Sequence, residues 1–315
     1  MSFDLRVLVI ALSSFAMGSF AASACVPWLW RRLRSRTPAG RANALLRVRV
    51  MPLIFAVASL ALAVLSFLEF EPRRPDEPMG VVLLALAALG AVLLAAGLAR
   101  LAWLFVSTAR LERAWMADAA PATVDGTDVP AFSVPSSFPI VAVTGLRRPR
   151  LIIARSVLAA CTPDELRAIV AHECGHVARR DNLARAVMAL SPDLLAWLPI
   201  STRLAHAWHE AAEEAADDHA ALLGDRGRLW LAEALIRVAR LVPAGSTQLV
   251  VPASALYRGE NLDRRVRRLL EPPAEVLPPP SIWWRAAGAG AILASGALAL
   301  HAVHELLEAA VTFLP

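Results

Sequence analysis

Three long apolar runs constrain the fold of this chain more than any other feature of its sequence. They cover Leu5–Trp30, Val50–Phe70 and Val81–Val106 and contain few charged residues. Each reaches the ~20 residues that an α-helix needs to cross the ~30 Å hydrocarbon core of a bilayer. Because lipid offers backbone amides no hydrogen-bonding partner, such segments must be helical. An Ala- and Gly-rich run from Ile282 to about Leu300 predicts a fourth transmembrane helix.

Arginines between the apolar runs predict the orientation of the chain. The loop after the first run and the start of the next segment carry many arginines and no acidic residue, whereas Arg73 and Arg74 in the second loop are offset by nearby carboxylates. The arginines of the first group are Arg31, Arg32, Arg34, Arg36, Arg41, Arg47 and Arg49. By the positive-inside rule the first loop is cytoplasmic, so we expect the N-terminus outside and residues 110–284 inside. The first run is too long and too weakly flanked by basic residues for a cleaved signal peptide, so we expect a retained anchor.

The composition excludes several classes of protein. Hydrophobic residues make up 57% of the chain and charged residues 19%, which is unlike a typical soluble domain. We attribute the net charge of +5 to topology and to contact with anionic lipid headgroups, because no basic stripe with interleaved aromatic residues indicates nucleic-acid binding. The cysteines Cys25, Cys161 and Cys174 are too few and too scattered for a disulfide framework.

The segment between the third and fourth apolar runs has a mixed pattern of strands and helices. Residues 110–139 are polar and contain several prolines and one glycine, so we expect a linker there. Thr162, Pro163 and Glu165 form a capping box with proline at the first helical position, which predicts a helix from Pro163 to about Arg180. A hydrophobic stretch over Ala186–Ile200 is broken by prolines. We further expect strands over Ile140–Val143 and Arg150–Ala154 and helices over Ser201–Leu223 and Leu229–Leu241.

The sequence His172-Glu173-Cys174-Gly175-His176 is an H-E-x-x-H motif inside the capped helix. A spacing of four residues places both imidazoles on one helix face, about one turn apart, where they can bind the same metal ion. Glu173 then lies beside the ion, where it can deprotonate a water whose pKa zinc lowers to about 7. We therefore predict Zn²⁺ as cofactor, His172 and His176 as its ligands and Glu173 as the catalytic base.

A third protein ligand is expected on the helix over Ser201–Leu223. Its acidic residues crowd together, with no Lys or Arg between Leu204 and Leu223, so a nearby cation is an attractive partner. We assign Glu213 as the ligand, with Glu214 as its competitor, and expect Asp217 and Asp181 to orient the imidazoles. His206, His209 and His219 remain alternatives for stabilising an oxyanion. His301, His304 and Glu305 form a second polar cluster, for which an interfacial position is the default interpretation.

At these positions the chain resembles the BlaR/MecR-type membrane metallopeptidases. The similar stretches are Pro139–Arg155, Pro163–Leu183 with the H-E-x-x-H motif, and Glu213-x-x-Ala216-Asp217-Asp218, with a weaker similarity over Leu262–Leu270. The resemblance implies zinc ligation by His172, His176 and Glu213, catalysis by Glu173, and a gluzincin-like domain between the third and fourth spans. Receptors of that type carry an extracellular β-lactam-binding domain after the fourth span, and the present sequence ends there, so antibiotic sensing cannot be inferred.

Taken together, we expect a mainly α membrane protein with four transmembrane helices and a cytoplasmic α+β zinc peptidase domain. Residues 1–109 would form the membrane part, 110–281 the peptidase domain, and 282–315 the fourth helix with a short external end. The expected function is hydrolysis of peptide bonds at the plasma membrane, with a cytoplasmic transcriptional repressor as the expected protein substrate. Two alternatives stay open: a quality-control or processing peptidase of the HtpX or CAAX-protease type, and a non-catalytic membrane scaffold or signalling subunit.

Overall fold

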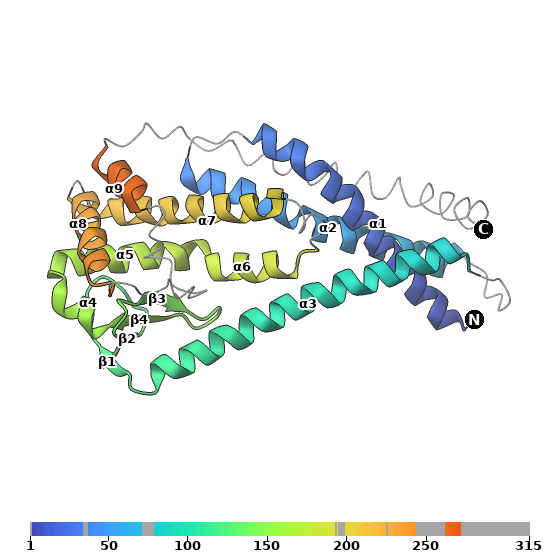
Figure 1. Ribbon diagram of the computed structural model, residues 1–315. Helices are drawn as coiled ribbons and strands as arrows, with labels where there is room; N and C mark the ends of the chain where they lie inside the picture. Colours follow the sequence, from blue (N-terminus) through green and yellow to red (C-terminus); the bar gives the residue numbers. More distant parts are fainter. Residues whose placement is uncertain are drawn as a thin grey trace.

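Three long helices form one end of the molecule in the computed structural model (Figure 1). The structure describes residues 2–33, 37–70, 79–192, 194, 199–224, 226–243 and 262–271. Helices α1 (Phe3–Arg32), α2 (Pro38–Phe70) and α3 (Val81–Met116) are each long and apolar enough to cross a membrane. Many of their large apolar side chains are exposed, among them Phe20, Ile54 and Val92, as lipid-facing residues would be. The expected fourth helix over residues 282–300, with His301, His304 and Glu305, lies outside the described residues.

Close packing of the three helices depends on small residues. A Cβ atom at Gly90 of α3 would lie 2.0 Å from the carbonyl oxygen of Leu12, and one at Gly18 of α1 would lie 2.6 Å from that of Phe55. Only glycine allows backbones to approach so closely, as is common between membrane helices. Glycine therefore sets the crossings of α1 with α2 and α3.

Two of these helices extend by ten residues or more beyond the apolar runs that predict them. Helix α2 begins at Pro38, because the Thr37 side chain accepts a hydrogen bond from Gly40 N over 3.1 Å and caps the first turn. Helix α3 continues through Met116. These extensions carry the helices beyond their apolar stretches toward the remainder of the fold, and Figure 1 shows α3 running past α6 to the small sheet.

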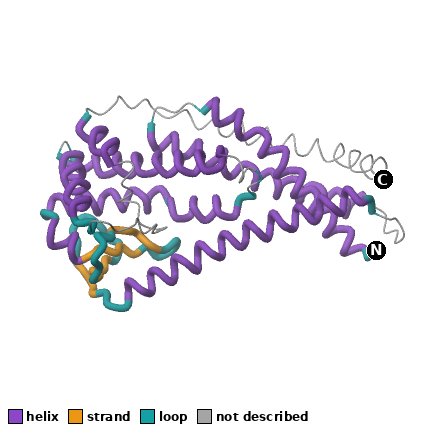
Figure 2. Tube along the Cα trace, in the orientation of Figure 1, coloured by secondary structure: helices purple, strands orange, loops and turns teal. Residues whose placement is uncertain are grey.

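A four-stranded sheet and shorter helices build the other end (Figure 2). The strands are β1 (Ala120–Ala122), β2 (Ala131–Val134), β3 (Val141–Thr144) and β4 (Arg150–Ala154), in the order β1-β2-β4-β3. The expected strand pair is present as the antiparallel β3 and β4, with β3 at the sheet edge. The expectation of a linker over 110–139 is wrong in part, because that segment contributes the end of α3 and both β1 and β2. Their short, Ala- and Pro-containing sequences give little strand signal.

The helices after the sheet include the three that the sequence predicts, which correspond to α5, α7 and α8. They are α4 (Arg155–Ala160), α5 (Pro163–Arg179), α6 (Asp181–Leu190), α7 (Pro199–Ala220) with a 3₁₀ turn over Ala221–Leu223, α8 (Gly227–Arg240) and α9 (Leu262–Leu270). Helices α4, α6 and α9 were not expected as separate helices. The mainly helical class with a small sheet is confirmed, and the division of the chain into three regions stays a prediction.

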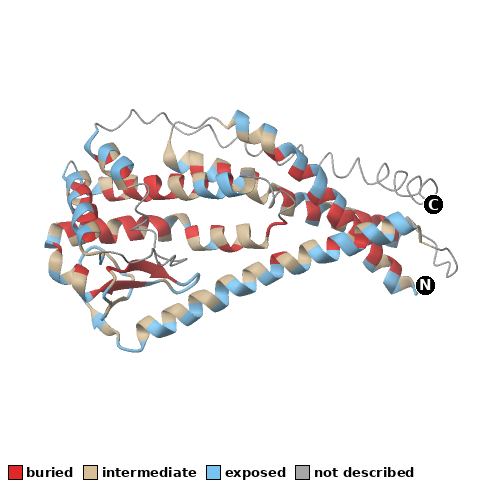
Figure 3. Ribbon diagram, viewed as in Figure 1, coloured by how far each residue is buried: buried red, intermediate tan, exposed pale blue. Residues whose placement is uncertain are grey.

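Two apolar cores hold these elements together, and Figure 3 shows buried residues concentrated along α5, α7 and the sheet. One core joins the sheet to α5 and α8 through residues such as Ile152, Ile169 and Leu235. The other joins α7 to the first halves of α2 and α6 through Leu45, Ala184 and Trp208. Because α2 takes part in the second core, the membrane-capable helices and α7 share one packed body.

Candidate metal centre

Helix α5 carries the motif, and its first turn is fixed by the predicted cap. Thr162 Oγ1 accepts a hydrogen bond from Glu165 N over 3.3 Å, and Glu165 Oε2 accepts one from Thr162 N over 2.7 Å. The other oxygen of this buried carboxylate lies 2.9 Å from Arg237 on α8. The helix ends at Arg179, the next residue Arg180 has a left-handed φ of 56°, and α6 starts at Asp181. This turn places Asp181 back against the last turn of α5.

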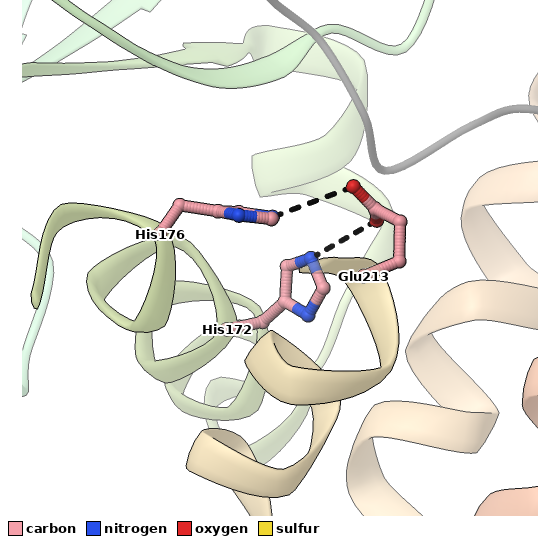
Figure 4. Close-up of side chains that lie close together, drawn as sticks. All are labelled: His172, His176 and Glu213. Atoms are coloured by element: carbon pink, nitrogen blue, oxygen red, sulfur yellow. Dashed lines mark ion pairs between the residues drawn. The ribbon is translucent and has the colours of Figure 1, made fainter. Parts of the chain in front are cut away.

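Three side chains from α5 and α7 converge on one point (Figure 4). His172 Nε2 lies 3.6 Å from Glu213 Oε2, and His176 Nε2 lies 3.5 Å from Glu213 Oε1. One ligand atom from each residue lies within 4.8 Å of the others. The two imidazole rings are 4.9 Å apart between centroids and nearly perpendicular, at 87°. Each ring therefore points one nitrogen toward the same carboxylate.

The atoms that face one another here have the properties of a metal site. All three residues are buried. Within the described part of the chain, the Nε2 atoms of both histidines and both oxygens of Glu213 make no hydrogen bond. Arg265 lies 3.1 Å from Glu213 Oε2, but buried nitrogens and oxygens without hydrogen bonds are costly, and the convergence of these atoms is explained if they bind an ion. Two imidazoles and one carboxylate are a donor set that suits a catalytic zinc ion, which keeps a further coordination position open.

Each imidazole is also held at its second nitrogen. His176 Nδ1 donates a hydrogen bond to Asp181 Oδ2 over 2.8 Å, and His172 Nδ1 lies 3.0 Å from Asp217 Oδ1. Such partners fix the ring orientation and direct the other nitrogen to a metal. Burial opposes protonation of His172, but Asp217 and Glu213 outweigh it and raise its pKa to about 9 in the metal-free protein. Asp181 and Asp217 thus lie where an imidazole-orienting role requires them.

Glu173 lies beside the three converging residues and faces the sheet edge. Its Oε2 accepts a hydrogen bond from Val143 N of β3 over 3.1 Å, while its Oε1 has no partner among the described residues. Burial raises the pKa of this carboxyl, although the charges of His176 and His172 act in the opposite direction. A raised pKa suits a group that must both accept and return a proton.

Gly175 lets α5 and α7, which carry the three converging side chains, approach closely. A Cβ atom at this position would lie 2.9 Å from the Cβ of His219 and 3.1 Å from the Cα of Ala216, both on α7. Any larger residue would push α7 away from α5 and separate Glu213 from the imidazoles. The H-E-x-x-H pattern leaves the residue at this position open, so the motif alone does not reveal the requirement for glycine.

Arginines from other helices neutralise the acidic face of α7, which has no Lys or Arg of its own between Leu204 and Leu223. Arg264 pairs with Glu210 and Glu214, Arg268 pairs with Asp218, and Arg41 of α2 pairs with Glu214. Arg265 lies 3.1 Å from Glu213 Oε2 and donates two hydrogen bonds to Asp217. Burial would raise the pKa of Asp217, but the charge of Arg265 and the contact with His172 lower it to about 2. The cation expected near this face is therefore supplied in part by α9.

The competing candidates do not join the three converging side chains. Glu214, the alternative third ligand, is engaged by two arginines. His206 is exposed, His209 packs on Trp208, and His219 packs its Cβ against Gly175. Cys174 donates a hydrogen bond to Thr127, and the three cysteines are free. Among the described residues the only group that could hold a metal is His172, His176 and Glu213.

Comparison with known families gives one result for the chain. Residues 72–269 match the family described as BlaR1 peptidase M56. The match covers more than half of the 315 residues and includes α3, the sheet, both ligand-bearing helices and nearly all of α9. No curated protein matches the sequence.

Proposed function

Because this chain belongs to the BlaR1 peptidase M56 family, we propose that it is a membrane zinc endopeptidase whose ion is held by His172, His176 and Glu213. One observation carries the proposal. Two buried imidazole nitrogens and a buried carboxylate converge within 4.8 Å, and these atoms make no hydrogen bonds within the described residues. A purely structural role for this arrangement would leave the Nε2 atoms of both histidines buried without hydrogen bonds.

Glu173 is the proposed general base. Zinc, when bound by the three side chains, supplies Lewis acidity that polarises a scissile carbonyl and acidifies a water molecule. The free Oε1 of Glu173 accepts the proton of that water, and the carboxyl then returns it to the nitrogen of the departing amine. The hydrogen bond from Val143 N holds the other oxygen and keeps the carboxylate in place during both transfers.

The proposed substrate is a cytoplasmic protein, with a transcriptional repressor as first candidate. The arginine-rich end of α1 and start of α2 support a cytoplasmic position for the metal centre, because α2 packs directly against α7. Membership of a peptidase family supports hydrolysis of peptide bonds, and regulated cleavage of a repressor is our extension of it.

Substitution Glu173→Gln tests catalysis separately from metal binding. The proteomes of cells with the native protein and with the variant are compared for new protein termini. We expect fragments that appear with the native protein alone, while the purified variant keeps its bound zinc. Asp164→Asn is a matched control, because Asp164 lies half-exposed on the first turn of the same helix, where it pairs with Arg167.

Identical termini with native and variant protein would contradict the enzymatic proposal and favour a scaffold. Fragments drawn from many damaged membrane proteins, in place of one cytoplasmic protein, would favour a quality-control peptidase.

A further inference from the structure

Arg265 of α9 is the one buried arginine of that helix, with 5% of its side chain exposed. The other α9 arginines pair with acids farther from the metal centre: Arg264 with Glu210 and Glu214, Arg267 with Asp263, and Arg268 with Asp218. Their side chains are 46%, 74% and 26% exposed. Arg265 alone among them reaches inward to the residues that surround His172.

The contacts of Arg265 reach both ring nitrogens of His172 through two carboxylates. Asp217 Oδ1 lies 2.6 Å from Arg265 Nη2 and 3.0 Å from His172 Nδ1. Glu213 Oε2 lies 3.1 Å from Arg265 Nη1 and 3.6 Å from His172 Nε2. One guanidinium group therefore contacts both carboxylates that face the His172 ring. Asp217 lies at the Nδ1 side of the ring, and Glu213 lies at the Nε2 side, which faces the proposed metal.

Contacts other than those of Arg265 also attach α9 to the fold. Arg228 of α8 donates hydrogen bonds to the carbonyl oxygens of Leu269, Arg268 and Glu271 at the end of α9. Leu269 is 3% exposed in the core shared by α5, α8 and the sheet. Because these contacts hold α9 in place, the inward reach of Arg265 serves the metal centre more than the attachment of the helix.

We propose that Arg265 is a positioning residue that holds Asp217 and Glu213 in the arrangement needed for tight metal binding. The proposal rests on the proposed zinc function. A planar guanidinium fork suits this role, because it engages two carboxylates in fixed directions at once, which a lysine ammonium cannot do. A role in charge neutralisation alone predicts the opposite outcome: removing a positive charge beside the site would strengthen binding of a divalent cation.

Zinc dissociation constants of the full-length protein in detergent provide the test, measured by competition with a chromophoric chelator in the Glu173→Gln background to prevent proteolysis. We expect Arg265→Gln to weaken zinc binding about 10–100-fold, the range for loss of a group that orients metal ligands. Arg265→Lys should give an intermediate loss. Arg267→Gln removes the same charge from the exposed side of α9 and should bind zinc like the parent.

Zinc binding by Arg265→Gln as tight as in the parent, or tighter, would overturn the inference. If the variant does not fold, hydrogen exchange of the parent protein decides: added zinc should slow exchange over 262–271, because coupling between two sites is reciprocal. Unchanged exchange on zinc binding would refute the role of Arg265. Failure of the parent itself to bind zinc would refute the proposed function, so the two failures are distinguishable.

Discussion

Two histidines one helical turn apart are oriented by partners from different places in the chain. His176 is held by Asp181, five residues later, across the left-handed turn at Arg180. His172 is held by Asp217 from another helix. Sequence spacing alone identified the histidines, Glu173 and both aspartates as candidates. It could not identify Arg265, because a side chain 48 residues from Asp217 meets it only through the docking of α9.

The reactivity of Cys161 tests whether this side chain is buried beside the N-terminal cap of α5. Burial, and then the charge of Glu165, raises the pKa of its thiol to about 11. The thiolate is the reactive form, so at about pH 8 we expect iodoacetamide to modify Cys161 only after unfolding. Mass spectrometry of native and denatured protein measures this directly, and prompt alkylation of Cys161 in the native protein would contradict the packing described.

Elements with strong local signals were predictable, and elements set by tertiary contacts were not. The capping box and Pro163 predict the start of α5, and Gly224 marks the end of the α7 segment. Strands β1 and β2 have weak β propensity, and they form because β2 pairs in parallel with β4. Helix α6 follows α5 directly and ends where Arg100 of α3 donates hydrogen bonds to the carbonyls of Ala189 and Ser191. No local pattern encodes that contact.

Gly175→Ala tests whether close approach of α5 and α7 assembles the site. The added methyl group collides with His219 and Ala216, so we expect a loss of about 1–3 kcal/mol in the free energy of unfolding despite the better helix propensity of alanine. Zinc affinity should fall as well, because the ligands come from both helices. Denaturant unfolding and chelator competition measure the two effects.

Ala178→Gly, at an exposed position of α5, is the control for Gly175→Ala. We expect it to cost about 1 kcal/mol of stability through helix propensity while zinc affinity is unchanged. Wild-type zinc affinity in Gly175→Ala would show that the crossing does not set the geometry of the site.

At the scale of the whole molecule, the long helices reach from the apolar bundle to the metal centre. The N-terminus and the start of α3 lie at one end in Figure 1, and the sheet with α5 and α8 lies at the other. The arginine-rich start of α2 contributes Leu45 and Val48 to the core under α7. Hydropathy predicted the three long helices. It did not predict that α2 continues to the core under α7, because this extension depends on the Thr37 cap and on side chains that precede the apolar run.

Orientation in the membrane is testable by cysteine labelling in a background with Cys25, Cys161 and Cys174 replaced by alanine. A membrane-impermeant maleimide should label Ser2→Cys in intact cells and label Asp125→Cys, in the β1–β2 loop, only after permeabilisation. This follows from the arginine distribution and the positive-inside rule. The reverse pattern of labelling would place the metal centre outside the cell.

X-ray absorption at the zinc edge, on the full-length Glu173→Gln protein, tests the central claim most directly. The account predicts about one zinc per chain, with two imidazole ligands and oxygen donors at about 2.0–2.2 Å and no sulfur in the coordination sphere. Substituting Glu213→Gln should reduce the bound zinc, whereas His206→Gln, at an exposed position of the same helix, should not. Protein that binds no zinc, or a spectrum without imidazole scattering, would contradict the account.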